Sequence, residues 1–272
     1  MKPSELLQYH KLLTDEEYLI RVSNLPIPNS KSVIEKIKQM KKKCSKKVNP
    51  HSYELSRLMN ATFSCRYMEI FKNRLSVHNT IVHYPGLRFY DQVKLEFEKV
   101  TGKTLVLFDD FLTKRVCIKN RTRNVAVSDP NYLCESAVAY LIDLEADPRC
   151  SLPFWTSSVK LAAEMIIFVS DHFMGDWLNE FVMIETTGQE LTMNPSAIPR
   201  AHPFILITGD ILDEDCASVY CERTKIMSNL TFWNAVLLCY YLHYIFNLTY
   251  LESDAGLFQA FDAELASNQK FV

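Results

Sequence analysis

The sequence predicts an α+β fold that is mostly helical, and three observations lead to it. Only 6 of the 272 residues are glycine, beside 13 Tyr and 16 Phe, which favours helices over tight hairpins. Residues 230–251 form the most apolar run of the chain. Three short segments, 181–186, 203–208 and 217–226, are rich in β-branched and aromatic residues. We therefore expect a small antiparallel sheet packed on a central apolar helix.

The apolar run 230–251 predicts the core helix. Its larger side chains recur at helical spacing and leave few polar positions, which are Asn234, His243 and Asn247. A membrane span of this length is the alternative, but these three side chains would need partners in lipid and no basic cluster flanks the run. The pattern favours a buried helix, with His243 as a core histidine bonded to a backbone carbonyl.

The first 123 residues predict a helical region. Capping residues and breaks such as Asn49-Pro50, Pro85-Gly86 and Gly102 divide it into segments with apolar stripes. In the first long segment we expect Val33, Ile34, Ile37 and Met40 to point inward. In the segment 53–71, the residues expected to point inward are Tyr53, Leu55, Leu58, Met59, Phe63, Tyr67 and Ile70. The predicted helices are 4–13, one beginning near 14, 31–47, 53–71 as one or two helices, 75–84, 90–100 and 105–113.

Residues 119–130 are polar and predict a linker, after which the composition changes. We expect helices at 130–144 and 157–169, then the three strands, the core helix and a closing amphipathic helix at 254–265. The predicted division is a basic helical region, 1–123, followed by an acidic α+β region, 124–272.

Charge supports this division. Residues 1–123 carry 24 Lys and Arg against 12 Asp and Glu, a net charge of +12, and residues 124–272 carry 6 against 20, a net charge of −14. Two such regions either bind different partners or face each other.

Two basic clusters are the candidate binding residues. Lys and Arg side chains placed near phosphates release counterions, so such clusters suit sequence-independent contact with DNA or RNA. A solvated helix face followed by a flexible linker is the alternative interpretation. The candidate residues are Lys36, Lys38, Lys41, Lys42, Lys43, Lys46 and Lys47 in the first cluster, and Lys114, Arg115, Lys119, Arg121 and Arg123 in the second.

Three motifs point towards enzymes, and each lacks a necessary part. Gly102-Lys103-Thr104 resembles the end of a P-loop, but Phe97 stands where the preceding glycine is required. Asp109, Asp110 and Asp171 could bind a metal ion, yet no further acid has diagnostic spacing. Ser170, Asp171 and His172 are sequence neighbours and point apart, with no nucleophile elbow.

We therefore predict a non-enzymatic binding protein with no catalytic residues, cofactor or metal site. A protein adaptor or a self-assembling structural protein is the alternative, and a metal-dependent nuclease or transposase remnant is a further one. The eight cysteines include no C-x-x-C pair, which favours reduced thiols. The acidic, interrupted N-terminal segment predicts an intracellular protein, nuclear or cytoplasmic, with no membrane partner.

Three stretches carry a family resemblance. They are ELSRLMNATFSCRYMEI (54–70) with VHNTIVHYPGLRFYDQVKLEFEKVTG (77–102), the loop and helix at 128–144, and HPFILITGD, VYCERTKIM and AVLLCYYLHYIFNLTY within 202–250. Together they resemble a group of uncharacterised, mobile-element-associated animal proteins similar to sterile alpha motif domain-containing proteins. The resemblance covers roughly residues 51–262 and implies a shared fold. The sterile alpha motif itself is absent, and Cys65-Arg66 replaces the Arg-Arg pair typical of the group.

Overall fold

A single helix, α11 (Phe232–Ile245), lies at the centre of the computed structural model, which describes residues 17, 20, 30–45, 53–105, 169, 181–185 and 201–267. Every residue of α11 except Asn234 is buried. Thr231 begins the helix, because its side chain accepts a hydrogen bond from the backbone N–H of Asn234. Neighbouring segments therefore pack against α11 on nearly all of its faces.

The core helix is shorter than the predicted range 230–251. Asn247 has a left-handed backbone, with φ of 50°, and the N–H of Leu248 donates to the carbonyl of His243 at 2.8 Å. The N–H of Asn247 donates to the carbonyl of Tyr244 at 3.3 Å. These two bonds form a Schellman motif, which ends a helix at a residue in the left-handed conformation. The apolar residues that follow therefore belong to the turn and to the next segment.

Four strands form one sheet in the order β1 (Val182–Glu185), β2 (Phe204–Thr208), β3 (Ala217–Cys221) and β4 (Thr224–Leu230). The α+β prediction is confirmed, with one difference in the sheet. β1 is parallel to β2, whereas β2, β3 and β4 are antiparallel in sequence order, so the sheet is mixed.

The predicted strand 217–226 is a hairpin. Cys221 pairs with Thr224, and the two residues between them, Glu222 and Arg223, have φ of 45° and 63°. Positive φ at both central residues defines the type I′ turn, whose twist matches that of paired strands. Asn and Gly are the usual residues of this turn, so Glu-Arg gave no signal of a chain reversal.

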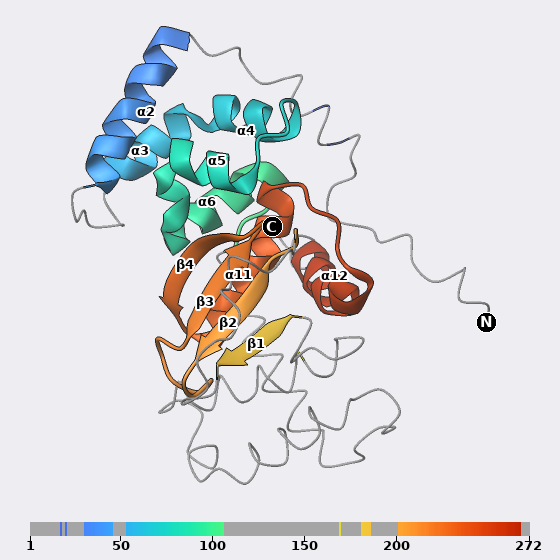
Figure 1. Cartoon of the computed structure of the whole chain (residues 1–272). Coiled ribbons are helices and arrows are strands. Elements are labelled where there is room, and N and C mark those ends of the chain that lie inside the picture. Colours follow the sequence, from blue (N-terminus) through green and yellow to red (C-terminus); the bar gives the residue numbers. More distant parts are fainter. Residues whose placement is uncertain are drawn as a thin grey trace, which may run out of the picture.

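The N-terminal helices are α2 (Ser30–Cys44), α3 (Tyr53–Ala61), α4 (Phe63–Phe71), α5 (Val77–His83), the 3-10 helix η2 (Pro85–Arg88) and α6 (Tyr90–Thr101). They gather on one side of the molecule, and the sheet lies on the other (Figure 1). α6 ends at Gly102, whose φ is 69°, as predicted for a helix-ending glycine. Gly86 allows η2 to approach α3, since an added Cβ would lie 2.4 Å from the sulfur of Met59.

Most predicted inward positions are buried, and two are wrong. Leu55, Leu58 and Met59 are buried in α3, but Tyr53 is 84% exposed because it lies two residues before Leu55, on the opposite side of the helix. In α2, Val33 and Met40 are buried, whereas Ile34 is 53% exposed.

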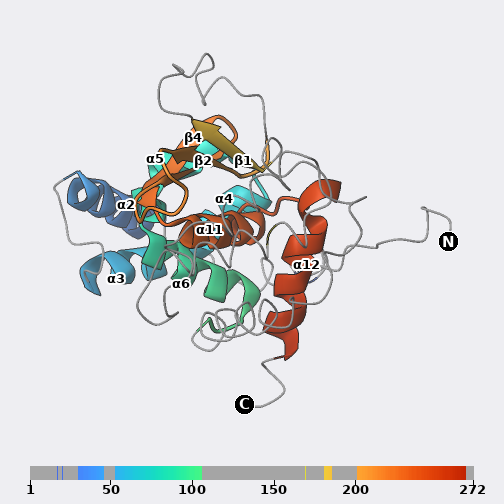
Figure 2. The same ribbon diagram turned by 90° about the horizontal axis from the view of Figure 1, so that it is seen from below.

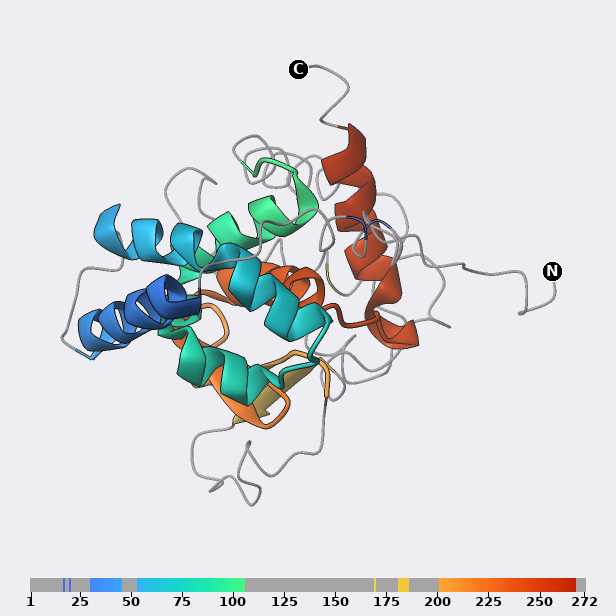
Figure 3. The ribbon, with the colours of Figure 1, turned by 90° about the horizontal axis from the view of Figure 1, so that it is seen from above.

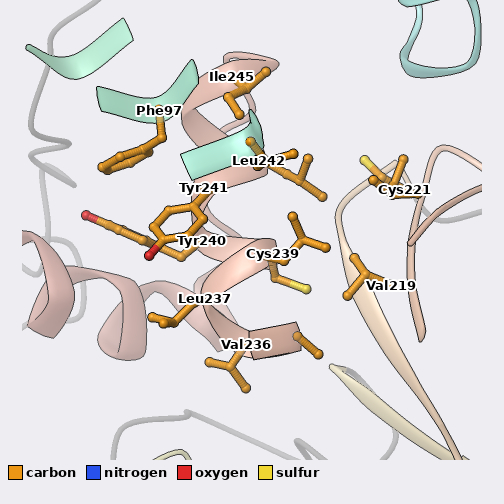
Figure 4. Close-up of a cluster of buried hydrophobic side chains, with 14 of the residues drawn as sticks. Phe97, Val219, Cys221, Val236, Leu237, Cys239, Tyr240, Tyr241, Leu242 and Ile245 are labelled. Atoms are coloured by element: carbon orange, nitrogen blue, oxygen red, sulfur yellow. The ribbon is translucent and has the colours of Figure 1, made fainter. Parts of the chain in front are cut away.

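One hydrophobic core joins the N-terminal helices to the sheet. Seen from below, α11 runs between the sheet and α6 (Figure 2). Phe97 of α6 packs on Tyr241 with ring centroids 4.8 Å apart. Figure 4 shows Phe97 on one side of α11 and Val219 and Cys221 of β3 on the other. The described parts of the basic and acidic regions thus share one core. The predicted boundary at residue 123 lies outside the described residues.

α12 (Glu252–Ser267) closes the described chain, longer than the predicted helix at 254–265, and lies beside α11 and away from α2 (Figure 3). Among the described residues, no helix has the length and apolar content needed to cross a bilayer. The predicted helices at 4–13, 105–113 and 130–144, the linker 119–130 and most of 157–169 lie outside the described residues.

Candidate functional site

The lysine-rich helix α2 is the described part of the predicted binding surface. Val33 and Met40 fix it to the core through one stripe, which turns the opposite side towards solvent. Lys38, Lys41 and Lys42 are exposed and follow i, i+3, i+4 spacing, so they share one face. We call these three residues the lysine face.

Two more predicted residues of α2 are half-buried beside this face. Lys43 forms an ion pair with Glu54 of α3. Lys36 lines a hollow of about 300 Å³ between α2 and α3, together with Glu35 and Arg57. Elsewhere in the described chain, no acidic side chain lies within ion-pair distance of the lysine face. The lysine face is therefore the part of the cluster open to a polyanion.

The remaining predicted basic residues fall outside the described parts of the chain. They are Lys46, Lys47, Lys114, Arg115, Lys119, Arg121 and Arg123. The charge difference holds without them. Residues 30–45 and 53–105 carry 14 Lys and Arg against 6 Asp and Glu, and residues 201–267 carry 2 against 9.

Arg66 is a basic residue that cannot serve as a phosphate ligand. It is fully buried in α4, and its Nε donates to Glu96 Oε1 of α6 at 2.7 Å while Nη2 donates to Glu96 Oε2. Nη1 donates to Thr62 Oγ1 at 2.9 Å, and the guanidinium lies 5.2 Å from the ring centroid of Tyr84. This bidentate pair links α4 to α6. Sequence analysis missed it, because partners 30 residues apart leave no local signal.

Beside this pair, Cys65, Glu69 and Tyr84 form a hydrogen-bonded group. The hydroxyl of Tyr84 donates to Glu69 Oε2 at 2.9 Å and lies 3.6 Å from the sulfur of Cys65. Burial raises the pKa of the Cys65 thiol and, more strongly, the pKa of Tyr84. Such burial disfavours the thiolate form that a cysteine nucleophile uses.

A second buried polar group connects α11 to α12. Asp262 Oδ1 accepts hydrogen bonds from the hydroxyls of Tyr240 at 2.7 Å and Tyr244 at 2.6 Å. The hydroxyl of Tyr250 reaches Oδ2 of the same carboxylate at 3.1 Å. Buried carboxylates require such donors, and here three tyrosines supply them. This group holds α12 in place.

His243 is a core histidine, as predicted. Its ring packs on Phe258 with centroids 4.9 Å apart, and its Nε2 lies 3.9 Å from Asp254 Oδ2. The polar neighbour among the described residues is therefore a carboxylate and not the predicted backbone carbonyl. Cys239 lies one turn earlier in α11, and the three residue types are those of a cysteine nucleophile triad. All three side chains are buried, and burial raises the pKa of the Cys239 thiol well above its usual value. A substrate therefore has no route to this thiol.

Two of the three enzyme motifs lie outside the described residues. Asp109, Asp110, Ser170, Asp171 and His172 lie outside the described residues. Within the described ranges, no group of three or more His, Cys, Asp or Glu side chains could hold a metal ion. Lys103 and Thr104 follow the helix-ending Gly102, where the backbone leaves α6.

Comparisons with protein families, curated proteins and solved structures found no match to this chain. The resemblance to proteins similar to sterile alpha motif domain-containing proteins remains a prediction from the sequence alone.

Proposed function

We propose that the protein binds single-stranded nucleic acid through the lysine face of α2. The observation that carries the proposal is the position of Lys38, Lys41 and Lys42, which are exposed on one face of a helix whose other side is fixed to the core. Phosphates of a nucleic-acid backbone would contact these ammonium groups and release counterions. A rigid helix presents the charges at constant spacing.

Tyr53 supports a single-stranded ligand. Glu54, the next residue in α3, pairs with Lys43 in the last turn of α2, so Tyr53 lies in the turn of α3 that meets the end of the lysine-rich helix. This ring is 84% exposed, which is unusual for so large an aromatic side chain. An exposed ring beside cations can stack on an unpaired base, as many single-strand-binding proteins do.

A protein adaptor or self-assembling protein is the competing function, supported by the charge difference between residues 30–105 and 201–267. Lysines in the last turn also stabilise a helix through its dipole, which would explain Lys41, Lys42 and Lys43 without any ligand. The two functions predict different responses to salt and to nucleic acid.

The test is fluorescence anisotropy with a labelled single strand of DNA or RNA and with a matched duplex. In the triple variant Lys38→Gln/Lys41→Gln/Lys42→Gln, the slope of log affinity against log salt should fall by about 2, because each phosphate contact on a single strand contributes roughly 0.7. Lys72→Gln/Lys103→Gln/Lys225→Gln removes the same charge elsewhere and should behave as wild type.

Tyr53→Ala tests the choice of strand. Losing one stacked base should weaken single-strand binding by a factor of about 5 to 150, while duplex binding should not change. Equal slopes for the two lysine variants would refute the lysine face. A wild type that binds no nucleic acid at 50 mM salt, yet self-associates in gel filtration and dissociates as salt rises, would establish the competing function.

A further inference from the structure

A hollow of about 490 Å³ opens where three chain segments meet, on a part of the molecule separate from the lysine face. The segments are the end of α4 with the turn into α5, the β3–β4 turn, and the end of α11. Its size falls in the range of roughly 300–1,000 Å³ that is usual for ligand sites. The lining residues are Ile70, Phe71, Arg74, Leu75, Ser76, Val77, Glu222, Phe246, Asn247 and Leu248.

The base of the hollow is apolar. Ile70, Val77 and Phe246 are buried there, at 7%, 1% and 8% exposure, and Phe71, Leu75 and Leu248 are half-buried around them. An apolar group of a ligand would lose contact with water in this space, which favours its entry.

Besides Ser76, whose hydroxyl accepts a hydrogen bond from the backbone N–H of Asn79 at the start of α5, three polar side chains stand around this apolar base. Glu222 accepts a hydrogen bond from the backbone N–H of Val77 at 2.8 Å. Asn247 has a buried side-chain oxygen that accepts no hydrogen bond from the described residues. Arg74 is exposed, and no hydrogen bond or ion pair joins its side chain to the described part of the chain. Among the described residues, the hollow thus offers a hydrogen-bond acceptor at Asn247 and a cation at Arg74.

All three polar residues have left-handed backbones, with φ of 50° at Arg74, 45° at Glu222 and 50° at Asn247. Glycine adopts this conformation without steric cost, whereas a side chain adds strain. At Glu222 the strain is offset by the hydrogen bond from the first turn of α5. At Asn247 the strain is small, because Asn is, after Gly, a usual residue at a left-handed helix end. Arg74 takes this conformation in the turn that ends α4, where the N–H of Leu75 donates to the carbonyl of Glu69 at 3.0 Å. Its guanidinium makes no hydrogen bond or ion pair among the described residues, so it is available to a ligand.

We propose that this hollow binds the carboxyl-terminal residue of a polypeptide whose last side chain is apolar. The guanidinium of Arg74 would pair with the terminal carboxylate through two parallel hydrogen bonds. The last peptide N–H would donate to the side-chain oxygen of Asn247, and the apolar side chain would enter the space above Phe246. The exposed position of Arg74 leaves the rest of the peptide a path to solvent.

Glu222 sets the charge that the site accepts. Its carboxylate lines the same hollow as Arg74, so a ligand with two negative charges, such as a phosphate, would meet stronger repulsion than a single carboxylate.

The probes are N-acetyl-L-phenylalanine and its uncharged amide, titrated into the full chain and followed by nuclear magnetic resonance shifts. The acid should bind with a dissociation constant on the order of 1 mM, as expected for so small a ligand, and the amide should bind at least tenfold more weakly. A six-residue peptide ending in the same residue should bind at least as tightly as the acid.

Arg74→Gly separates binding from folding. Glycine suits the φ of 50°, so the unfolding temperature should not fall, while affinity for the acid should drop at least tenfold. Arg223→Gly is the matched control: it makes the same change at a φ of 63°, in a residue that does not line the hollow, and should bind as wild type. Asn247→Gly should fold and bind several-fold more weakly.

Three results would overturn the proposal. They are the lack of saturable shifts at about 10 mM acid, equal affinities of Arg74→Gly and Arg223→Gly, and a six-residue peptide that fails to bind although N-acetyl-L-phenylalanine does. None of these results bears on nucleic-acid binding, which is measured on the same proteins with the labelled strand.

Discussion

Glu96→Gln should destabilise the protein more than such a small change of side chain suggests. The substitution keeps the shape of the side chain, removes its charge and replaces one of the two acceptor oxygens of Arg66 by an NH2 group, so packing between α4 and α6 is preserved while the ion pair is lost. Arg66 remains a cation that is fully buried, with Thr62 Oγ1 and the Met59 carbonyl as its neutral partners. Arginine stays protonated in proteins, so this charge cannot be relieved by losing a proton.

The magnitude follows from the burial of both partners. Arg66 is 0% exposed and Glu96 is 1% exposed, so solvent screening is negligible. Breaking a buried pair by removing one partner costs about 3–5 kcal/mol in the free energy of unfolding. For a domain of this size, about 1 kcal/mol shifts the unfolding temperature by roughly 2–4 °C, so we expect a drop of about 6–20 °C.

Thermal unfolding followed by circular dichroism would measure this shift. The double variant Arg66→Met/Glu96→Leu is the control, because it removes both charges together and should recover most of the lost stability. Met59 O retains a donor in the hydroxyl of Thr62, which lies 3.3 Å away. An unfolding temperature of Glu96→Gln within about 2 °C of wild type would refute the view that this pair holds α4 to α6.

Three further predictions concern the core and its titratable groups. Phe246→Asp should lower the free energy of unfolding by more than the roughly 1.5–3 kcal/mol that burying such a side chain contributes, because the substitution also buries a charge at the end of α11. An unfolding temperature equal to that of wild type would contradict this prediction. Burial and the nearby carboxylate of Asp262 raise the pKa values of Tyr240 and Tyr250 well above 10.0. The native state therefore keeps protons that the unfolded chain releases above its ordinary tyrosine pKa, so stability should fall as pH rises beyond that value, and tyrosinate absorbance should appear together with unfolding. Burial raises the pKa of the Cys216 thiol from 9.0 to about 11, so its thiolate fraction at pH 8 is lowered about 100-fold; alkylation followed by mass spectrometry should be slower than that of an exposed thiol by at least this factor.

Local signals located most helices and strands. These signals are backbone preferences and burial patterns, which neighbouring residues determine. They are the apolar run 230–251, the helix-ending Gly102 and the β-rich segments at 203–208 and 217–226. The sequence also predicted the lysine-rich helix, but the structure decided that Lys38, Lys41 and Lys42 are the members of the cluster on one exposed face. Their role in binding nucleic acid remains a prediction.

Chain reversals without typical turn residues escaped the sequence analysis. Glu222 and Arg223 take the type I′ turn, and Asn247 ends α11, because the core on both sides holds these residues in left-handed conformations. An isolated segment of the same sequence has no strong preference for them. Tertiary packing thus shortened the core helix and divided one predicted strand into two.

The sequence alone determined the fold class, the core helix and the basic character of α2, because periodicity and charge are properties of neighbouring residues. Only the tertiary structure decided which polar groups meet. Arg66 pairs with Glu96 of another helix, and Asp262 accepts hydrogen bonds from three tyrosines of the α11 region. The same holds for the hollow that contains Arg74 and Asn247, since its walls come from three segments. Such groups come together only when the burial of apolar side chains brings distant segments into contact. Local sequence patterns do not specify which distant segments meet.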